Sequence, residues 1–178
     1  MRRNVAKFAL PLLALASCNG GDPPAAASPG PSVTGATARL SDASGRSVGT
    51  ASVSRAAGGL RVEAEVTGMP PGLHGVHIHM TGRCDPPTFA TAGAHWSPAM
   101  RQHGLDNPQG SHAGDMPNID VSADGRGRVT HILPGAVIAS LLDVDGTALV
   151  VHASEDDQKT DPSGNSGARI ACGAFTAN

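Results

Sequence analysis

Hydrophobic and polar residues alternate in several short runs of the chain, a pattern typical of half-buried β-strands. The clearest run is 60–66, where Leu, Val, Ala and Val alternate with Arg, Glu and Glu. Further short runs lie at 37–40, 49–54, 75–79, 119–122, 128–133, 148–151 and 169–175. Gly-containing turn clusters separate many of them, and no helical pattern of useful length is evident. We therefore expect an all-β fold, an antiparallel Greek-key β-barrel or sandwich of about eight strands.

Two segments show neither the alternation of a β-strand nor the periodicity of a helix, and they are predicted to be loops. Residues 81–118 form the longer loop, and residues 156–167 form a shorter, polar one. A structureless stretch as long as the first is unusual unless it is functional or is held by a metal or a disulfide. The longer loop holds Cys84, His95, His103, His112 and Asp115, so we expect it to be held by a metal or a disulfide.

The N-terminal residues look like a targeting segment and are left out of the fold prediction. Basic residues precede a short apolar run at 8–16, which cannot span a bilayer as a stable helix. Leu15-Ala16-Ser17-Cys18 resembles the lipobox of bacterial lipoproteins, in which the cysteine is acylated and becomes the mature N-terminus. Ordinary signal-peptidase cleavage is the alternative, because Ala14-Leu15-Ala16 also fits its small-x-small rule. We favour lipidation, since ordinary cleavage would leave an odd thiol in an oxidising compartment.

This reading divides the chain into three parts. Residues 1–17 are interpreted as a lipoprotein-type signal peptide. Residues 18–32, rich in Gly, Pro, Ala and Ser, are interpreted as a flexible tether, and residues 33–178 as one folded domain. The predicted location is the periplasm or cell envelope, with a lipid anchor to the membrane at Cys18.

Composition narrows the function classes. The net charge of −2 and the lack of a long basic run give no sign of a nucleic-acid-binding surface.

With Cys18 accounted for by lipid, Cys84 and Cys172 remain as one pair, which an exported protein can keep as a disulfide. Two unrelated buried thiols are the alternative.

Histidines at fixed spacing carry the candidate chemistry. In an extended strand, His77 and His79 point to the same face and form half of a metal site. Further candidate ligands follow at His95, His103, His112, Asp115 and His152. Imidazole-rich sets suit copper or zinc, and three His with one Asp make a reasonable tetrahedral zinc site. Seven candidates are too many for one ion, whereas two sites sharing a ligand would use them all.

Several motifs, in order, make the chain similar to the copper,zinc superoxide dismutase family, in particular to its exported bacterial lipoprotein-type members. The segment 74–79, HGVHIH, fits the family's HGxHxH, and 92–98, AGAHWSP, fits AGxHxxP. The closing segment 164–173, GNSGARIACG, fits GNxGxRxxCG. Shorter matches lie at 102–104, 112–115 and 150–152. Together they cover most of residues 33–175. The resemblance implies that the longer loop, 81–118, is a metal-binding loop and that 156–167 is a second active-site loop.

The resemblance implies a role for each matching residue. His77, His79 and His152 match copper ligands, and His95 matches the histidine whose imidazolate bridges copper and zinc. His103, His112 and Asp115 match the remaining zinc ligands, and Cys84–Cys172 matches the disulfide that anchors the zinc loop. Arg169 matches the guanidinium that guides the anion to copper. Asp156, chosen over Asp157 on spacing, matches the carboxylate that hydrogen-bonds one copper histidine and one zinc histidine.

The implied function is an antioxidant oxidoreductase that converts superoxide to dioxygen and hydrogen peroxide, with copper and zinc as cofactors. Arg169 and His95 are the predicted catalytic residues. The alternative is a non-catalytic copper-binding or copper-handling domain on the same barrel. His74 is interpreted as structural and His131 as a surface residue. Monomer and homodimer both stay open, because subunit contacts vary within the family.

Overall fold

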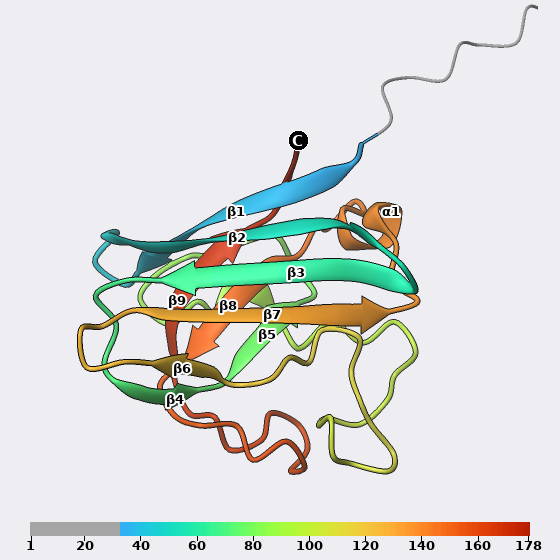
Figure 1. Cartoon of the computed structure of the whole chain (residues 1–178). Helices are drawn as coiled ribbons and strands as arrows, with labels where there is room; N and C mark the ends of the chain where they lie inside the picture. The colour runs from blue at the N-terminus through green and yellow to red at the C-terminus, as the bar shows by residue number, and fades with distance from the viewer. Residues whose placement is uncertain (1–32) are drawn as a thin grey trace, which may run out of the picture. The chain divides into compact units, whose positions relative to one another are not determined.

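The computed structural model describes residues 33–178, which form an antiparallel β-barrel with long loops at one end (Figure 1). The predicted signal peptide, Cys18 and tether lie outside the described residues. Ten strands follow in chain order: β1 (Gly35–Asp42), β2 (Ser47–Ala56), β3 (Gly59–Val66), β4 (Gly72–His74), β5 (Val76–His79), β6 (Ile119–Val121), β7 (Gly127–Pro134), β8 (Ala148–His152), β9 (Arg169–Ala174) and β10 (Thr176–Ala177).

The strands form one sheet in the order β4-β6-β7-β3-β2-β1-β9-β8-β5, with β10 beside β1. Its two edge strands, β4 and β5, are consecutive in the chain and only Gly75 lies between them. Gly75 N–H donates to the carbonyl of Ser154 at 2.9 Å, and His152 N–H donates to the carbonyl of Gly75 at 2.9 Å. The sheet therefore nearly closes on itself at Gly75, the residue directly before β5.

The all-β prediction is confirmed, and the alternation of residue types explains the core. In β3 the apolar residues Leu60, Val62, Ala64 and Val66 are at most 1% exposed, while the charged residues between them face outward. The expected eight strands become ten because β4 lies before the predicted strand 75–79 and was not predicted, and because the two-residue β10 has too short a pattern to detect.

His131 differs from its interpretation as a surface residue. It pairs with the buried Val62 across β3 and β7, so it shares the inward face with Val129 and Leu133 and is only partly exposed. Burial lowers the pKa of its imidazole. The reason is register: in β7 every second residue faces the barrel interior whether or not it is apolar.

Helical structure is sparse in residues 33–178. A 3-10 turn, η1 (Ala90–Ala92), lies in the long loop, and one short helix, α1 (Ile138–Leu141), follows β7. No helix in this part of the chain has the length and apolar character needed to cross a bilayer. Both predicted loops are present as irregular segments, and they lie beside β5 and β8.

Candidate metal centre

The site is built along β5, which presents two histidines on alternate positions. Val76 and Ile78 are fully buried in the core, so His77 and His79 face the opposite side, toward the loops. The long loop pairs with this strand: Ile78 N–H donates to Gly114 and Trp96 N–H donates to Ile78, both at 2.8 Å. Local pairing sets His79 opposite His95 and His77 opposite Asp115.

A glycine permits this close approach. A Cβ at Gly114 would overlap the carbonyl oxygen of Ile78, so a larger residue would push the loop away from β5. His152 reaches the same place from the end of β8, because β5 and β8 pair antiparallel. The structure thus brings together residues from β5, β8 and the long loop.

Four imidazoles form a first group: His77, His79, His95 and His152, whose candidate ligand atoms lie within 4.8 Å of one another. Each has one buried ring nitrogen without a hydrogen-bond partner: His77 Nδ1 and the Nε2 atoms of the other three. Buried polar atoms are rarely left unpaired in folded proteins. Four converging orphan nitrogens therefore fit a bound metal ion that prefers imidazole, such as copper.

The other nitrogens of three of these rings have backbone or carboxylate partners. His79 Nδ1 lies 2.9 Å from the carbonyl of Gly93, and His152 Nδ1 lies 3.1 Å from the carbonyl of Gly167. His77 Nε2 lies 2.6 Å from Asp156 Oδ2. Such partners fix both the orientation and the tautomer of a ligand ring, leaving the free nitrogen to face the ion.

A second group surrounds the carboxylate of Asp115. The Nδ1 atoms of His95, His103 and His112 lie 3.1, 3.0 and 3.3 Å from its Oδ1. Its Oδ2 accepts the backbone N–H groups of Gly104 and His112 at 2.8 and 2.9 Å. Three imidazoles and one carboxylate that converge in this way fit a tetrahedral zinc site.

His95 belongs to both groups, with Nδ1 in the second and the orphan Nε2 in the first. Another geometric grouping joins His77 to His95, His103 and Asp115. We prefer His112 to His77 in the second group, because His77 Nε2 is occupied by Asp156 and its Nδ1 faces the first group.

Asp156 connects the two groups. It is 1% exposed, and its two oxygens lie 2.6 Å from His77 Nε2 and 3.0 Å from His103 Nε2. Its backbone is held on both sides by Asn118, whose side chain donates to its carbonyl and accepts its N–H, each at 2.8 Å. Asp157 is exposed and bonds within its own loop.

The pKa of His103 shifts in the opposite direction to the pKa values of the first group. Desolvation lowers the pKa of His79 to about 2, of His152 to about 3 and of His95 to about 4, and it also lowers the pKa of His77. Burial likewise opposes the charge on His103, but hydrogen bonds with Asp115 and Asp156 outweigh it and raise its pKa to about 9. At neutral pH the first group is therefore uncharged, and a metal at the second must displace a proton.

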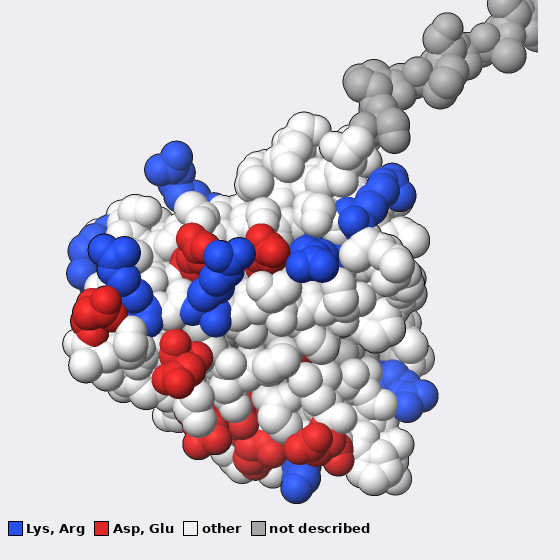
Figure 2. Space-filling view, in the orientation of Figure 1, with Lys and Arg blue, Asp and Glu red and all other residues white. Residues whose placement is uncertain are grey.

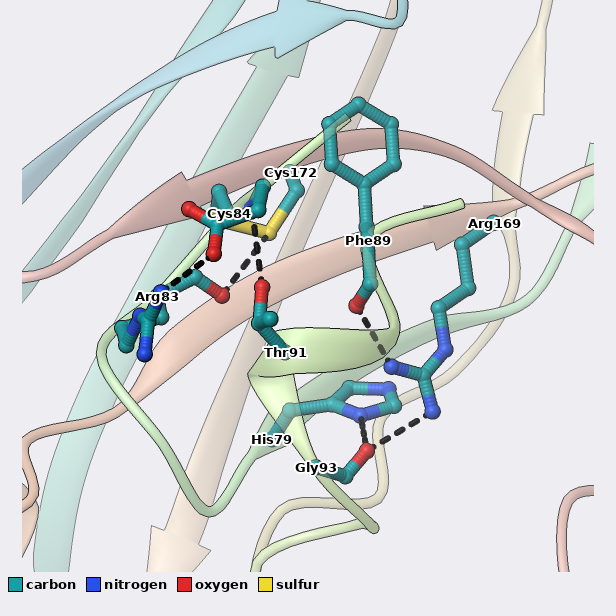
Figure 3. Close-up of a disulfide and its surroundings, with 9 residues drawn as sticks. His79, Arg83, Cys84, Phe89, Thr91, Gly93, Arg169 and Cys172 are labelled. Carbon is teal, nitrogen blue, oxygen red and sulfur yellow. Dashed lines mark hydrogen bonds and ion pairs between the residues drawn. A yellow bond between two sulfur atoms is a disulfide. The ribbon is translucent and has the colours of Figure 1, made fainter. Parts of the chain in front are cut away.

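Arg169 lies beside the first group (Figure 3). Its Nη1 donates to the carbonyl of Phe89 and its Nη2 to that of Gly93, both at 2.7 Å, so it shares Gly93 with His79. Further guanidinium N–H donors remain for an anion. It also lines a surface pocket of about 390 Å³ between the two loops.

A disulfide links Cys84 to Cys172, as the sequence predicted, with Cα atoms 5.6 Å apart. It fastens the start of the long loop to β9, three residues after Arg169 (Figure 3). The carbonyls that hold Arg169 belong to the segment just after Cys84, so the cross-link limits where that segment can move.

Several contributors to the site have no signal in the sequence. The carbonyls of Gly93, Phe89 and Gly167 act through backbone atoms, which every residue carries. His74, predicted to be structural, is buried with its ring nitrogens 2.8 Å from the carbonyl of His152 and 2.9 Å from that of Pro70. Asn118 could have been noticed only as a polar residue next to a strand.

Comparison with known proteins agrees with this geometry. Residues 47–175 match the family model for copper/zinc superoxide dismutase (SODC). The chain is 43% identical over 135 residues to superoxide dismutase [Cu-Zn] 1 of Aquifex aeolicus, covering 72% of this chain and 80% of that protein.

Two solved structures are similar as well. The structure of a SOD-like protein from Bacillus subtilis has a TM-score of 0.75 at 37% identity, covering 79% of this chain and 97% of that one. The Cu/Zn superoxide dismutase from Brucella abortus has a TM-score of 0.67 at 31% identity, covering 79% and 98%. With the family model matching most of the chain and its relatives aligned over most of their length, the chain belongs to the copper/zinc superoxide dismutase family.

Proposed function

We propose that this protein is a superoxide dismutase that converts two superoxide ions and two protons to dioxygen and hydrogen peroxide. The observation that carries the proposal is the set of four buried, unpaired imidazole nitrogens beside the guanidinium of Arg169. Membership of the copper/zinc superoxide dismutase family supports it.

The proposed ligands follow from the two groups. Copper is held by His77, His79, His95 and His152, and zinc by His95, His103, His112 and Asp115. Copper, when bound, supplies one-electron exchange with superoxide, while zinc has no redox chemistry and holds the loop. Asp156 fixes the rings of His77 and His103, so it positions one ligand of each ion.

Arg169 binds and orients the substrate anion. Two of its N–H donors bond to the carbonyls of Phe89 and Gly93, which fix the plane of the guanidinium, and the remaining donors are available to an anion. Its charge is constant over the working pH range, as a permanent anion guide requires.

His95 would hold and release a proton at Nε2 when that atom is not bound to copper. Its other nitrogen faces Asp115, so the ring stays in place when Nε2 is free. The residue is 8% exposed, and Nε2 is buried without a hydrogen-bond partner. A proton held there can pass to the forming peroxide.

The charges around the site bear on long-range steering. Figure 2 shows mixed charges over the β-sheet and mainly acidic side chains at the lower end, where the loops lie. The second loop and the residue before it have the exposed acids Glu155, Asp157 and Asp161 against the single cation Lys159. We infer that local attraction by Arg169, rather than a broad positive field, captures the anion.

The test is superoxide dismutation by the purified protein, first as apoprotein and then after reconstitution with zinc and copper. A fast rate that depends on copper is expected. Tight copper binding without dismutation would contradict the proposal and favour the second candidate, a non-catalytic copper-binding or copper-handling domain. That candidate has one supporting observation, because a similar structure is described only as SOD-like.

We further propose that residues 1–17 direct export, that Cys18 is lipidated, and that residues 18–32 tether the domain of residues 33–178 to a membrane of the cell envelope. The lipobox-like sequence and the disulfide, which needs an oxidising compartment, support this. Cys18→Ala should move the protein from the membrane to the soluble fraction. Continued membrane association would refute lipidation at Cys18. Sedimentation of the soluble variant would also decide between monomer and homodimer.

A further inference from the structure

The two loops of the site meet at Asp161, a residue that the proposed ligand set does not use. Asp161 Oδ1 accepts a hydrogen bond from the backbone N–H of His103 at 2.7 Å. The same oxygen lies 4.0 Å from Nε2 of His112. One carboxylate oxygen of the second loop thus faces two of the three histidines around Asp115.

Neighbouring contacts hold the two loops together at this point. Asp106 N–H donates to the carbonyl of Gln158 at 3.0 Å. The side-chain amide of Asn107 lies between the loops and donates to the carbonyls of His103 at 2.8 Å and Lys159 at 3.3 Å. Asp161 is therefore kept opposite the histidines, even though half of its side chain is exposed.

The position of the ring proton on His112 decides which contact the carboxylate of Asp161 can make. His112 Nδ1 lies 3.3 Å from both Asp115 Oδ1 and His95 Nδ1, so it is the nitrogen that would bind a metal. The ring proton then sits on Nε2, the atom facing Asp161. Metal-bound histidines usually donate their second N–H to a carboxylate or carbonyl, which orients the ring and increases its basicity.

Apart from His95, which both groups share, the other histidines already have such a partner. His77 and His103 face Asp156, while His79 and His152 face backbone carbonyls. For His112 Nε2, the nearest carboxylate among residues 33–178 is that of Asp161. In the same part of the chain, Asp161 forms no ion pair with Lys or Arg that would neutralise it.

We propose that Asp161 is a positioning residue of the zinc site, which holds the backbone of His103 and accepts the Nε2–H of His112 when zinc is bound. The 4.0 Å separation has to shorten by about 1 Å to reach hydrogen-bond length. This inference rests on the zinc assignment of the proposed function, and it adds a residue whose loss weakens zinc binding without removing a ligand.

The experiment measures the zinc dissociation constant by competition with a chromophoric chelator for four forms of the protein: unaltered, Asp161→Ala, Asp161→Asn and Asp106→Asn. Removal of a carboxylate behind a metal ligand typically weakens binding about 10- to 100-fold, which is expected for Asp161→Ala. Asp161→Asn should lose less, because its amide oxygen still accepts the N–H of His103. Asp106→Asn removes a charge from the adjoining loop without removing a side-chain hydrogen bond, and it should bind like the unaltered protein.

Two further readouts separate positioning from general damage. Cobalt in the zinc position should give an altered visible absorption spectrum in Asp161→Ala, because a ligand ring has lost its orientation. Copper affinity of the zinc-free protein should stay unchanged, since no nitrogen of the first group contacts Asp161. If Asp161→Ala fails to fold, Asp161→Asn carries the test.

Unchanged zinc affinity in Asp161→Ala would overturn the inference, as would an equal loss in Asp106→Asn or a parallel loss of copper. Asp161→Asn binding as tightly as the unaltered protein would overturn a charged contact with His112, because the amide keeps the accepting oxygen and loses only the charge. Absence of zinc binding by the unaltered protein would overturn the zinc assignment itself, so the two failures are distinguishable.

Discussion

His95 presents its two ring nitrogens to different groups of side chains, whereas His152 has a nitrogen in only one of them. His152 Nδ1 is committed to the carbonyl of Gly167, and its Nε2 is free. The two histidines therefore differ in what their removal should do.

We expect His152→Ala to lose copper and dismutase activity while it keeps the disulfide and most of its zinc. Metal content after reconstitution, measured by mass spectrometry, checks this. His131→Ala, which removes a histidine outside both groups, serves as the control. Full activity in His152→Ala would refute the copper assignment.

At the same scale, Arg169→Glu should reduce capture of the anion, because a negative charge replaces the guanidinium beside the proposed copper position. The rate should then lose its dependence on salt or rise with added salt, since screening now weakens a repulsion. Stopped-flow decay of superoxide at several ionic strengths provides the measurement. A rate at low salt equal to that of the unaltered protein would contradict the role.

Among the elements, the long loop depends on its connection to β9. The Cys84–Cys172 disulfide closes a loop of 88 residues in sequence separation. The chain-entropy model gives about 4 kcal/mol for a closure of this length. The same connection limits the segment that carries the carbonyls of Phe89 and Gly93.

Replacing both cysteines, Cys84→Ser with Cys172→Ser, should lower the free energy of unfolding by about 4 kcal/mol. It should also slow anion capture, because Arg169 loses its fixed partners. Urea unfolding and the rate at low salt measure the two effects separately. A variant with lowered stability and an unchanged rate would show that the loop holds Arg169 without the cross-link.

At the scale of the whole molecule, the buried histidines should control how the apoprotein responds to pH. His79, His95 and His152 have pKa values below the ordinary 6.5, so the unfolded chain binds more protons below pH 6.5 and stability falls as the pH drops from there toward 4. His103 has a raised pKa of about 9, so its contribution is complete below pH 6.5 and is lost as the pH rises to 9.

The metal-free protein should therefore be most stable near pH 6.5, with each histidine changing the free energy of unfolding by at most about 1.4 kcal/mol per pH unit. Urea unfolding at pH 5, 6.5 and 9 tests this expectation. A flat profile would mean that these imidazoles do not keep their buried environments in the apoprotein.

Sequence patterns predicted the barrel well because residue alternation reports directly on which side of a strand is buried. In β3 every second residue is apolar, so the buried face of the strand follows without further information. The loops are different: nothing in the sequence shows that Gly93 supplies a carbonyl to both His79 and Arg169. Asp161 escaped notice for the same reason, since its contact with His103 is made to a backbone N–H.

The carboxylate of Asp156, which spans His77 and His103, has a thermodynamic consequence when the two metals bind as proposed. A metal ion at one site orders one of the two rings, His77 or His103. Both rings bond to the carboxylate of Asp156, so ordering one ring also fixes the carboxylate that orients the other. The two binding events are therefore energetically coupled. Linkage requires reciprocity: the factor by which zinc raises the affinity for copper equals the factor by which copper raises the affinity for zinc. The order of metal loading can then change the rate of assembly, but not the stability of the assembled centre.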